Sequence, residues 1–233
     1  MTTLDAADWS LPNGVDVRLA QGADEGSVYL PAREHRHISA YRSVLRQRQS
    51  RLGRWAARTL AAERLGLGPR DVPLVTAGDG APEVDGLYVS IAHTSRGGDP
   101  AALAAVASGP VGVDLERIGS RRPDLWTRIL RPDEHVLLDQ LGGPTDEVQT
   151  LLWVLKEAVL KGQRTGFRAG TQSVRLALDA AASPHRGVAT AEARDSGPWT
   201  VSFGRQRDLW LAVAWLGGPR QRAVADGQEK QTR

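Results

Sequence analysis

Residues 111–118 read VGVDLERI, and this short stretch decides the fold class that we predict for the chain. Its apolar and polar residues alternate, which is typical of a β-strand because successive side chains point to opposite faces. The three aliphatic residues then share one face, while Gly112, Asp114 and Glu116 share the other. We expect the aliphatic face to be buried and the opposite face to carry two neighbouring acids.

Segments on both sides of this strand indicate an α+β fold. Helical spacing of apolar residues predicts one or two helices at 37–67 and one helix each at 132–141 and 145–165. The segments that read as further strands are 88–93, 101–108, 173–179, 199–205 and 209–216. A faint echo of the first strand pair in the last predicts two similar α+β lobes in a pseudo-twofold arrangement, with the active site in the cleft between them.

The predicted domain organisation follows from these segments. We expect an N-terminal lobe at residues 1–109, a C-terminal lobe with the acidic strand at 110–217, and a mobile polar tail at 218–233. No apolar run is long enough for a membrane span, and the N-terminus lacks the pattern of a secretion signal. These features predict a cytoplasmic protein without a membrane partner.

Composition excludes several kinds of site. The chain of 233 residues contains no Cys, which rules out disulfides, thiolate metal sites and a Cys nucleophile. The formal net charge of +3 is slight, and basic residues are interleaved with acids except at 42–58. We therefore do not expect a nucleic-acid partner, although an Arg-rich nucleic-acid-binding protein stays as an alternative hypothesis.

The helix predicted at 145–165 contains LLWVLKEAVLKG (151–162), which carries two of the three lysines in an Arg-rich chain. Trp153, Glu157 and Lys161 are spaced by four residues and form one stripe on that helix. An ordinary Glu to Lys helix pair would give the same spacing. Lysine differs from arginine in being a compact, flexible point charge that can approach a phosphate.

The two acids of the central strand are the second candidate feature. Asp114 and Glu116 repel each other on one strand face unless a cation offsets their charge. Oxygen ligands without Cys or clustered His favour a hard ion such as Mg²⁺. The alternative is a pair of solvated acids at a sheet edge, neutralised by Arg117 or Arg121.

Together, these segments resemble a family signature. VGVDLE (111–116) followed by WVLKEAVLK (153–161) resembles the signature of the 4′-phosphopantetheinyl transferases. YVSIAHTS (88–95) and the Arg-rich stretch RQRQSRLGRWAAR (46–58) are similar to two further segments of that family. The length and the two predicted lobes resemble its larger, monomeric Sfp-type class.

The resemblance implies an activity and its partners. The expected reaction is the Mg²⁺-dependent transfer of the 4′-phosphopantetheine arm of coenzyme A to a serine of an apo acyl or peptidyl carrier protein. The product released would be adenosine 3′,5′-bisphosphate. Coenzyme A and the carrier protein are then the expected partners, and a noncatalytic homologue that binds either of them is the alternative.

The resemblance also implies residue roles. Asp114, Glu116 and Glu157 would hold the metal ion, and Glu157 would act as general base. Lys161 would be catalytic and would contact the phosphates. The other expected coenzyme A contacts are Arg46, Arg54, His93, Thr94 and Lys156. For the arginines the alternative is a solvated basic helix face, and for His93 it is a histidine that ends a strand and caps a loop.

Two positions depart from the family pattern. Ala92 stands where the family usually has Ser before the His, and GDGAP (78–82) lacks the Lys that usually precedes Pro82. Both positions normally touch coenzyme A, so their loss is expected to weaken its binding by roughly one to three kcal/mol unless other groups replace them.

Overall fold

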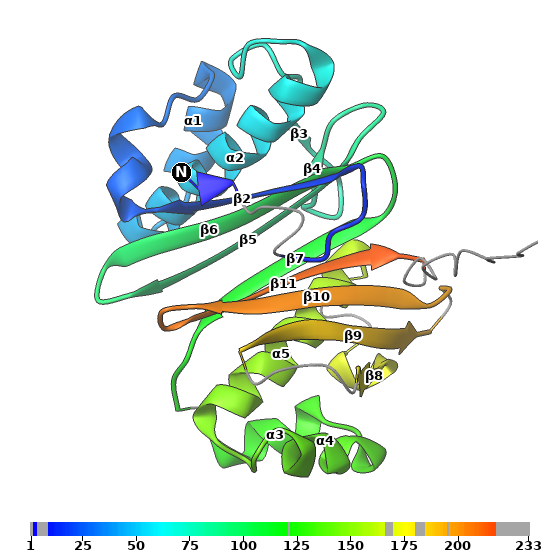
Figure 1. The fold of residues 1–233 in the computed structure, drawn as a ribbon. Helices are drawn as coiled ribbons and strands as arrows, with labels where there is room; N and C mark the ends of the chain where they lie inside the picture. The colour runs from blue at the N-terminus through cyan, green and yellow to red at the C-terminus, as the bar shows by residue number, and fades with distance from the viewer. Residues whose placement is uncertain are drawn as a thin grey trace, which may run out of the picture.

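A computed structural model of the chain describes residues 2–3, 9–120, 122–165, 170–179, 185–194 and 196–217. The expected tail at 218–233 lies outside the described residues. The chain has an α+β architecture built from antiparallel sheets and packed helices (Figure 1).

The N-terminal part contains a four-stranded sheet covered by a long helix. The strands are, in spatial order, β1 (Thr2–Thr3), β2 (Val15–Gln21), β6 (Asp99–Ala107) and β5 (Tyr88–Arg96). Helix α2 (Val44–Leu65) starts at Ser43, whose side chain accepts a hydrogen bond from the backbone N–H of Arg46. It ends at Gly66, which adopts the left-handed conformation with φ 65°.

The C-terminal part contains a five-stranded sheet covered by a second long helix. Its strands are, in spatial order, β7 (Val111–Arg117), β11 (Leu209–Leu216), β10 (Trp199–Gln206), β9 (Arg186–Ala193) and β8 (Val174–Leu178). Helix α5 (Asp146–Gly162) packs on this sheet and starts at Thr145, which accepts a hydrogen bond from Val148 N–H.

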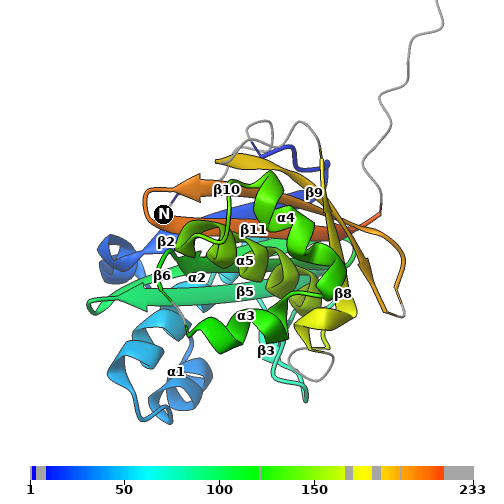
Figure 2. The ribbon, with the colours of Figure 1, turned by 90° about the horizontal axis from the view of Figure 1, so that it is seen from below.

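Smaller elements surround the two sheets. They are η1 (Gly22–Ser27), α1 (Ala32–Ser39), β3 (Val75–Thr76), β4 (Pro82–Glu83), α3 (Pro123–Ile129), η2 (Pro132–Glu134), α4 (His135–Gln140) and η4 (Thr171–Ser173). Strands β3 and β4 pair as a short hairpin. Viewed from below, α3 and α4 lie on the same side of the molecule as α5 (Figure 2).

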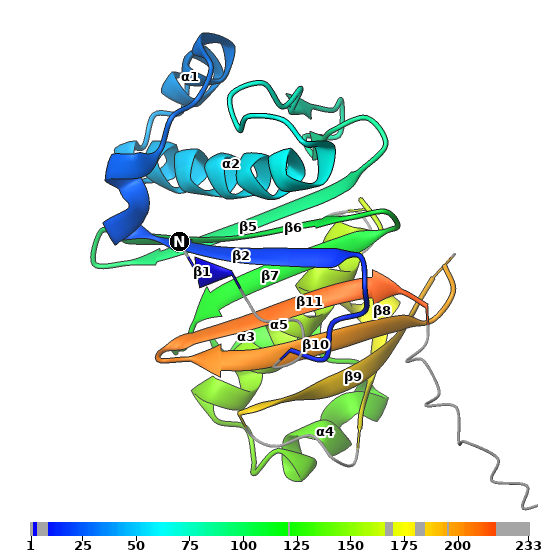
Figure 3. The same cartoon turned by 45° about the horizontal axis from the view of Figure 1, so that its top comes forward.

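The two sheets pack against each other, and each long helix lies on the outer face of one of them (Figure 3). Apolar residues of β2 and β6 meet those of β7 and β11 in one core between the sheets. A second core joins α2 to the first sheet, and a third joins α5 to the second. The alternation predicted for β7 is confirmed, because Val113 and Leu115 belong to the core between the sheets while Asp114 points toward α5.

Strand β7 and helix α5 approach each other unusually closely at two glycines. A Cβ on Gly112 would lie 2.0 Å from the carbonyl oxygen of Ala158 and 2.3 Å from the backbone N of Gly162. A Cβ on Gly162 would lie 2.5 Å from the ring of Trp199. Only glycine fits both positions, and this contact sets the distance between the strand that carries the acids and the helix that carries Glu157 and Lys161.

The predicted α+β class is confirmed, while several element predictions need correction. The segment at 37–67, predicted as one or two helices, contains the last residues of α1, which begins earlier, at Ala32, and all of α2. The sequence interpretation missed β2 and β9. The pseudo-twofold relation of two lobes and the boundaries at 109 and 217 stay predictions. None of the helices in the described part of the chain has the length and apolarity needed to cross a membrane.

Replacing Gly112 by Ala should destabilise the fold. The added methyl group would overlap the backbone of α5, and overpacking of this kind costs about 1–3 kcal/mol. Urea denaturation would measure the change in the free energy of unfolding. Gly109→Ala is the matched control, because a Cβ at Gly109 meets nothing within 4 Å. Equal stability of the two variants would contradict the close approach.

Candidate active site

The candidate site lies where the polar face of β7 meets the last turns of α5. Asp114 is 5% exposed, and its Oδ1 accepts a hydrogen bond of 2.5 Å from Nζ of Lys161. The Lys161 side chain is partly exposed, at 32%. The expected pairing of the acidic strand with the lysine-bearing helix is therefore present in the structure.

Glu157 lies one helical turn before Lys161 and is also buried, at 6% exposure. Its Oε1 and the Oδ2 of Asp114 are both buried oxygens that have no hydrogen-bond partner among the described residues. A buried carboxylate oxygen without a donor or a cation is energetically costly. A cation or a hydrogen-bond donor bound at these two oxygens would therefore offset the cost of their burial.

Both carboxyl groups titrate well above their usual range. Burial raises the pKa of Asp114 to about 6, although Lys161 partly offsets this effect. Burial and then the negative charge of Asp114 raise the pKa of Glu157 to about 7. Glu157 is thus poised to take up or release a proton near neutral pH.

Glu116 and Thr94 connect β7 to β5. The hydroxyl of Thr94 donates a hydrogen bond of 3.0 Å to Oε2 of Glu116. Thr94 is buried, whereas Glu116 is half-buried. The negative charge of Glu116 also contributes to the raised pKa values of Asp114 and Glu157, so Glu116 interacts electrostatically with both of these acids.

His93 and Arg46 form a second polar group beside the acids. Nη1 of Arg46 lies 2.9 Å from Nδ1 of His93 and also contacts Nε2 of the same ring. Burial, followed by the positive charges of Arg46 and Lys161, lowers the pKa of His93 to about 4. His93 is therefore neutral at neutral pH, and the two cations give this edge of the site a positive potential.

Arg54 does not have the free charge expected for a phosphate contact. It is 8% exposed, and its Nε donates a hydrogen bond of 2.5 Å to Oε2 of Glu34, while Nη1 donates to Thr76. Glu34 also pairs with Arg58, which is fully buried. Glu34 lies in α1, a helix that the sequence interpretation did not separate. The structure places Arg54 in a buried ion pair that joins α1 to α2, and its phosphate contact stays a prediction.

Lys156 also requires a correction. Its side chain is fully buried, and Nζ donates to Oε2 of Glu134 at 2.5 Å and to the carbonyl oxygen of Val174 at 2.8 Å. A longer contact of 3.3 Å reaches the carbonyl oxygen of Thr171. Lys156 therefore faces η2 and β8 instead of the acids, and the structure does not support the expected contact with coenzyme A.

The acids fit a hard cation only in part as they stand. Among the described residues, no three His, Cys, Asp or Glu side chains are gathered as a metal-binding group. Lys161 engages Asp114, and Thr94 engages Glu116, which keeps two of the expected ligands on other partners. The two buried oxygens without partners nevertheless match the oxygen donors that Mg²⁺ prefers.

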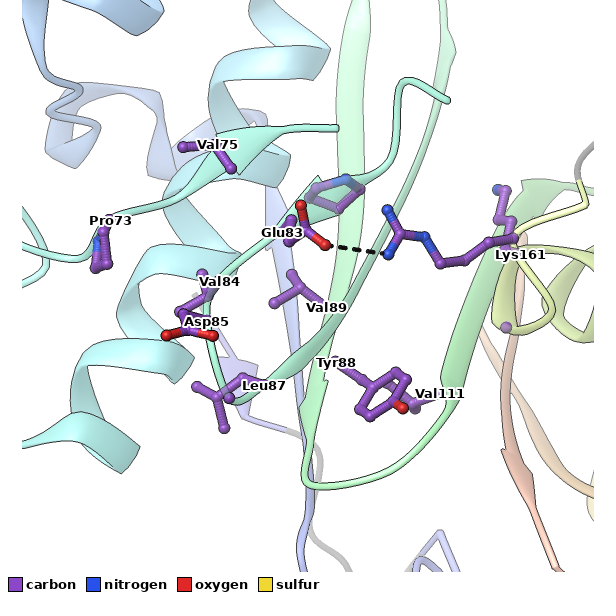
Figure 4. Close-up of a pocket in the computed structure, with 14 residues that line it drawn as sticks. Pro73, Val75, Glu83, Val84, Asp85, Leu87, Tyr88, Val89, Val111 and Lys161 are labelled. Carbon is purple, nitrogen blue, oxygen red and sulfur yellow. Dashed lines mark hydrogen bonds and ion pairs between the residues drawn. The ribbon is translucent and has the colours of Figure 1, made fainter. Parts of the chain in front are cut away.

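A cavity of about 640 Å³ opens next to Lys161 (Figure 4). One wall comes from Val111 at the start of β7 and from the end of α5 with Arg164, and the other from Pro73, Val75 and residues 82–89. Its apolar lining includes Val75, Leu87 and Tyr88. Its charged lining includes Arg164, which the sequence interpretation missed, and Glu83. The only signal in the sequence was the position of Arg164 near the C-terminal end of the helix predicted at 145–165.

The raised pKa of Glu157 predicts a pH-dependent cost in stability. A carboxyl group whose pKa is higher in the folded state binds more protons there, so the free energy of unfolding falls as pH rises from about 4.5 to about 7. Glu157→Gln should therefore raise the melting temperature at pH 8 by a few degrees and change it little at pH 4.

Thermal unfolding in a chelator would measure the effect of Glu157→Gln. Glu192→Gln, on an exposed position of β9, is the matched control and should not change the melting temperature. A Glu157→Gln variant that is less stable than the wild type at pH 8 would contradict the unpartnered buried charge.

Removing the buried charge of Lys156 should be strongly destabilising. Lys156→Met leaves Glu134 buried without its cation, and breaking one partner of such a pair costs about 3–5 kcal/mol. The double variant Lys156→Met/Glu134→Gln should recover part of this loss, because Gln is neutral and still accepts a hydrogen bond. Urea denaturation would compare both, and a mild effect of the single change would contradict the structural role.

Comparison with known proteins agrees with the position of this site. Residues 110–214 match the model of the 4′-phosphopantetheinyl transferase superfamily. Among curated proteins, no significant match to the chain was found. The matched range contains β7 and α5, which carry the three acids and Lys161. Residues 110–214 of this chain are thus similar to the 4′-phosphopantetheinyl transferase superfamily, as the motifs at 111–116 and 153–161 predicted.

Proposed function

We propose that the protein catalyses the Mg²⁺-dependent transfer of 4′-phosphopantetheine from coenzyme A to a serine of an apo acyl or peptidyl carrier protein. Adenosine 3′,5′-bisphosphate is the second product. The observation that carries the proposal is the pair of buried, unpartnered carboxylate oxygens of Asp114 and Glu157 beside Lys161. We further propose that the enzyme acts as a cytoplasmic monomer of the two-lobed class.

Asp114, Glu116 and Glu157 are the proposed metal ligands. Each of the first two has an oxygen in a hydrogen bond, Oδ1 of Asp114 with Lys161 and Oε2 of Glu116 with Thr94, so the second oxygen of each carboxylate is the proposed ligand atom. These residues would hold a Mg²⁺, which would supply positive charge to offset the negative charge of the pyrophosphate of coenzyme A. Lys161 lies beside the cavity, and the N–H donors of its ammonium group that do not bind Asp114 can turn to the phosphates.

The proposed transfer step uses Glu157 and Lys161. The serine oxygen forms a bond to the phosphorus that carries pantetheine, and the bond from this phosphorus to the bridging oxygen breaks. Glu157 accepts the serine proton. Lys161 stabilises the negative charge that develops on the departing oxygen.

The surroundings of the acids support binding of coenzyme A. A cavity of about 640 Å³ is of the size that binds small molecules, and its apolar lining suits the nonpolar surfaces of a nucleotide. Arg46 and His93 lie at the edge of the acidic cluster and are the proposed contacts for a phosphate. Thr94 is the proposed contact beside them.

The nucleic-acid alternative has less support. Arg48 pairs with Glu25, and Arg54 and Arg58 both pair with Glu34. Three arginines of the 46–58 stretch therefore have acidic partners within the fold, which lowers the positive potential that this stretch offers to a phosphate backbone.

Incubation of the protein with coenzyme A, Mg²⁺ and an apo carrier protein should add one phosphopantetheine to the carrier. Intact mass spectrometry of the carrier measures this addition. Asp114→Ala and Glu157→Ala should each lower the rate by more than about a hundredfold, because loss of a metal ligand exceeds the usual effect of loss of a supporting contact.

Glu192→Gln, which alters an exposed acid on β9, should leave the transfer rate unchanged. Carrier proteins of several types that all stay unmodified would contradict the proposal and favour a noncatalytic binding protein. Full activity of Asp114→Ala would contradict the metal site.

A further inference from the structure

Arg164 connects the two walls of the cavity through contacts with two acids. Its Nε lies 3.1 Å from Oδ2 of Asp79, and Nη2 lies 3.3 Å from Oδ1 of the same residue. Its Nη1 lies 3.4 Å from Oε1 of Glu83, the contact drawn in Figure 4. Arg164 follows the end of α5, whereas Asp79 and Glu83 belong to the β3–β4 hairpin.

These contacts are loose compared with the other ion pairs near the site. Charge-assisted hydrogen bonds usually measure about 2.7–2.9 Å, so all three distances are long. The side chains of Arg164, Asp79 and Glu83 are 37%, 34% and 48% exposed. Ion pairs at such exposure contribute about 0–1 kcal/mol. A competing anion can therefore displace these carboxylates at little energetic cost.

The two partners differ in how firmly the backbone holds them. The carboxylate of Asp79 accepts a hydrogen bond of 2.9 Å from Ala81 N–H, which fixes it to its own turn. Arg164 has a φ of 58°, in the left-handed region that non-glycine residues rarely adopt. This conformation occurs directly after α5, at the point where the side chain reaches the cavity. The guanidinium on its long side chain is thus the partner that can change position.

We propose that Arg164 is a substrate-binding cation that Asp79 and Glu83 hold in a resting position, and that a phosphate group of the substrate takes it from them. The proposal rests on the proposed function. Arg164 and Lys161 both line the cavity and both contact carboxylates in the structure. A phosphate matches the planar guanidinium with two parallel hydrogen bonds and carries more charge than a single carboxylate.

This arrangement also makes the cavity selective. Asp79 and Glu83 repel an anion for as long as their charges are not neutralised, and Arg164 has to leave them before it can bind one. A ligand with a phosphate dianion provides enough charge to compensate, whereas a neutral ligand of the same shape does not. Binding therefore favours phosphorylated ligands.

Isothermal titration with coenzyme A in the presence of Mg²⁺ tests the role of Arg164. Arg164→Asn should weaken binding about tenfold, as expected for loss of a charged hydrogen bond, and Asn tolerates the left-handed conformation. Asp79→Asn/Glu83→Gln should instead strengthen binding. Arg175→Asn removes the exposed ion pair with Asp133 outside this cavity and should have no effect.

A variant with all three changes distinguishes two possible roles of Arg164: direct contact with the phosphate, and neutralisation of the charges of Asp79 and Glu83. If Arg164 contacts the phosphate, adding Arg164→Asn to Asp79→Asn/Glu83→Gln should again weaken binding about tenfold. Equal affinity of the double and triple variants would overturn the proposal, as would weaker binding by Asp79→Asn/Glu83→Gln, which is expected if the ion pairs only hold the walls together.

Inorganic pyrophosphate serves as the second probe and separates this inference from the proposed function. Arg164→Asn should lower the affinity for pyrophosphate as well. A wild-type protein that binds pyrophosphate through Arg164 but does not bind coenzyme A would contradict the proposed function and support the role of Arg164. Unchanged pyrophosphate affinity in Arg164→Asn would overturn that role.

Discussion

The candidate site depends on the contact between Gly112 of β7 and the last turns of α5. Because neither Gly112 nor Gly162 has a side chain, the strand backbone lies directly against the helix backbone. Lys161 precedes the second glycine and reaches Asp114, two residues beyond the first, with a hydrogen bond of 2.5 Å. The ring of Trp199 also packs directly against Gly162, so a side chain at this position would not fit. The two glycines thus fix the distance between the backbones of β7 and α5, and this distance determines how far apart the charged side chains on the two elements lie.

The buried charges of the protein fall into two groups. Glu34 is neutralised by Arg54 and Arg58, and Glu134 is neutralised by Lys156, so these acids join helices to their neighbours. Asp114 and Glu157 are equally buried, yet each keeps an oxygen without a partner. The other two buried acids, Glu34 and Glu134, have cationic partners within the fold, in contrast to these unpartnered oxygens. The shortage of positive charge is therefore concentrated where a substrate and a cation are proposed to bind, which is a common compromise between stability and function.

Sequence patterns predicted the α+β class, the strand at β7 and the helix at α5, because each has a strong periodicity. Strand β2 shows a similar alternation in VDVRLAQ (15–21), and its omission was a failure to apply the same rule. The sequence did not indicate the partners that Lys156 and Arg54 have in the structure, for two different reasons. Residues five positions apart in an α-helix point in directions that differ by about 140° around the helix axis. Lys156 and Lys161 therefore do not share a helix face, and their spacing in the sequence predicts this difference. The partner of Arg54 lies twenty residues earlier in another helix, and no local pattern indicates that pairing.

The two lysines of α5 show why the same residue type serves different purposes on one helix. An ammonium group has three N–H donors, and Lys156 directs them at Glu134, Val174 and Thr171. Its hydrogen-bonding capacity is used within the fold. Lys161 has one hydrogen-bond partner among the described residues, Asp114, and its partly exposed ammonium borders the cavity. It therefore keeps donors for a ligand. Both lysines are charged, but they differ in the number of N–H donors that have no partner within the fold. This number distinguishes Lys156, which stabilises the packing of the helix, from Lys161, which is available to a phosphate.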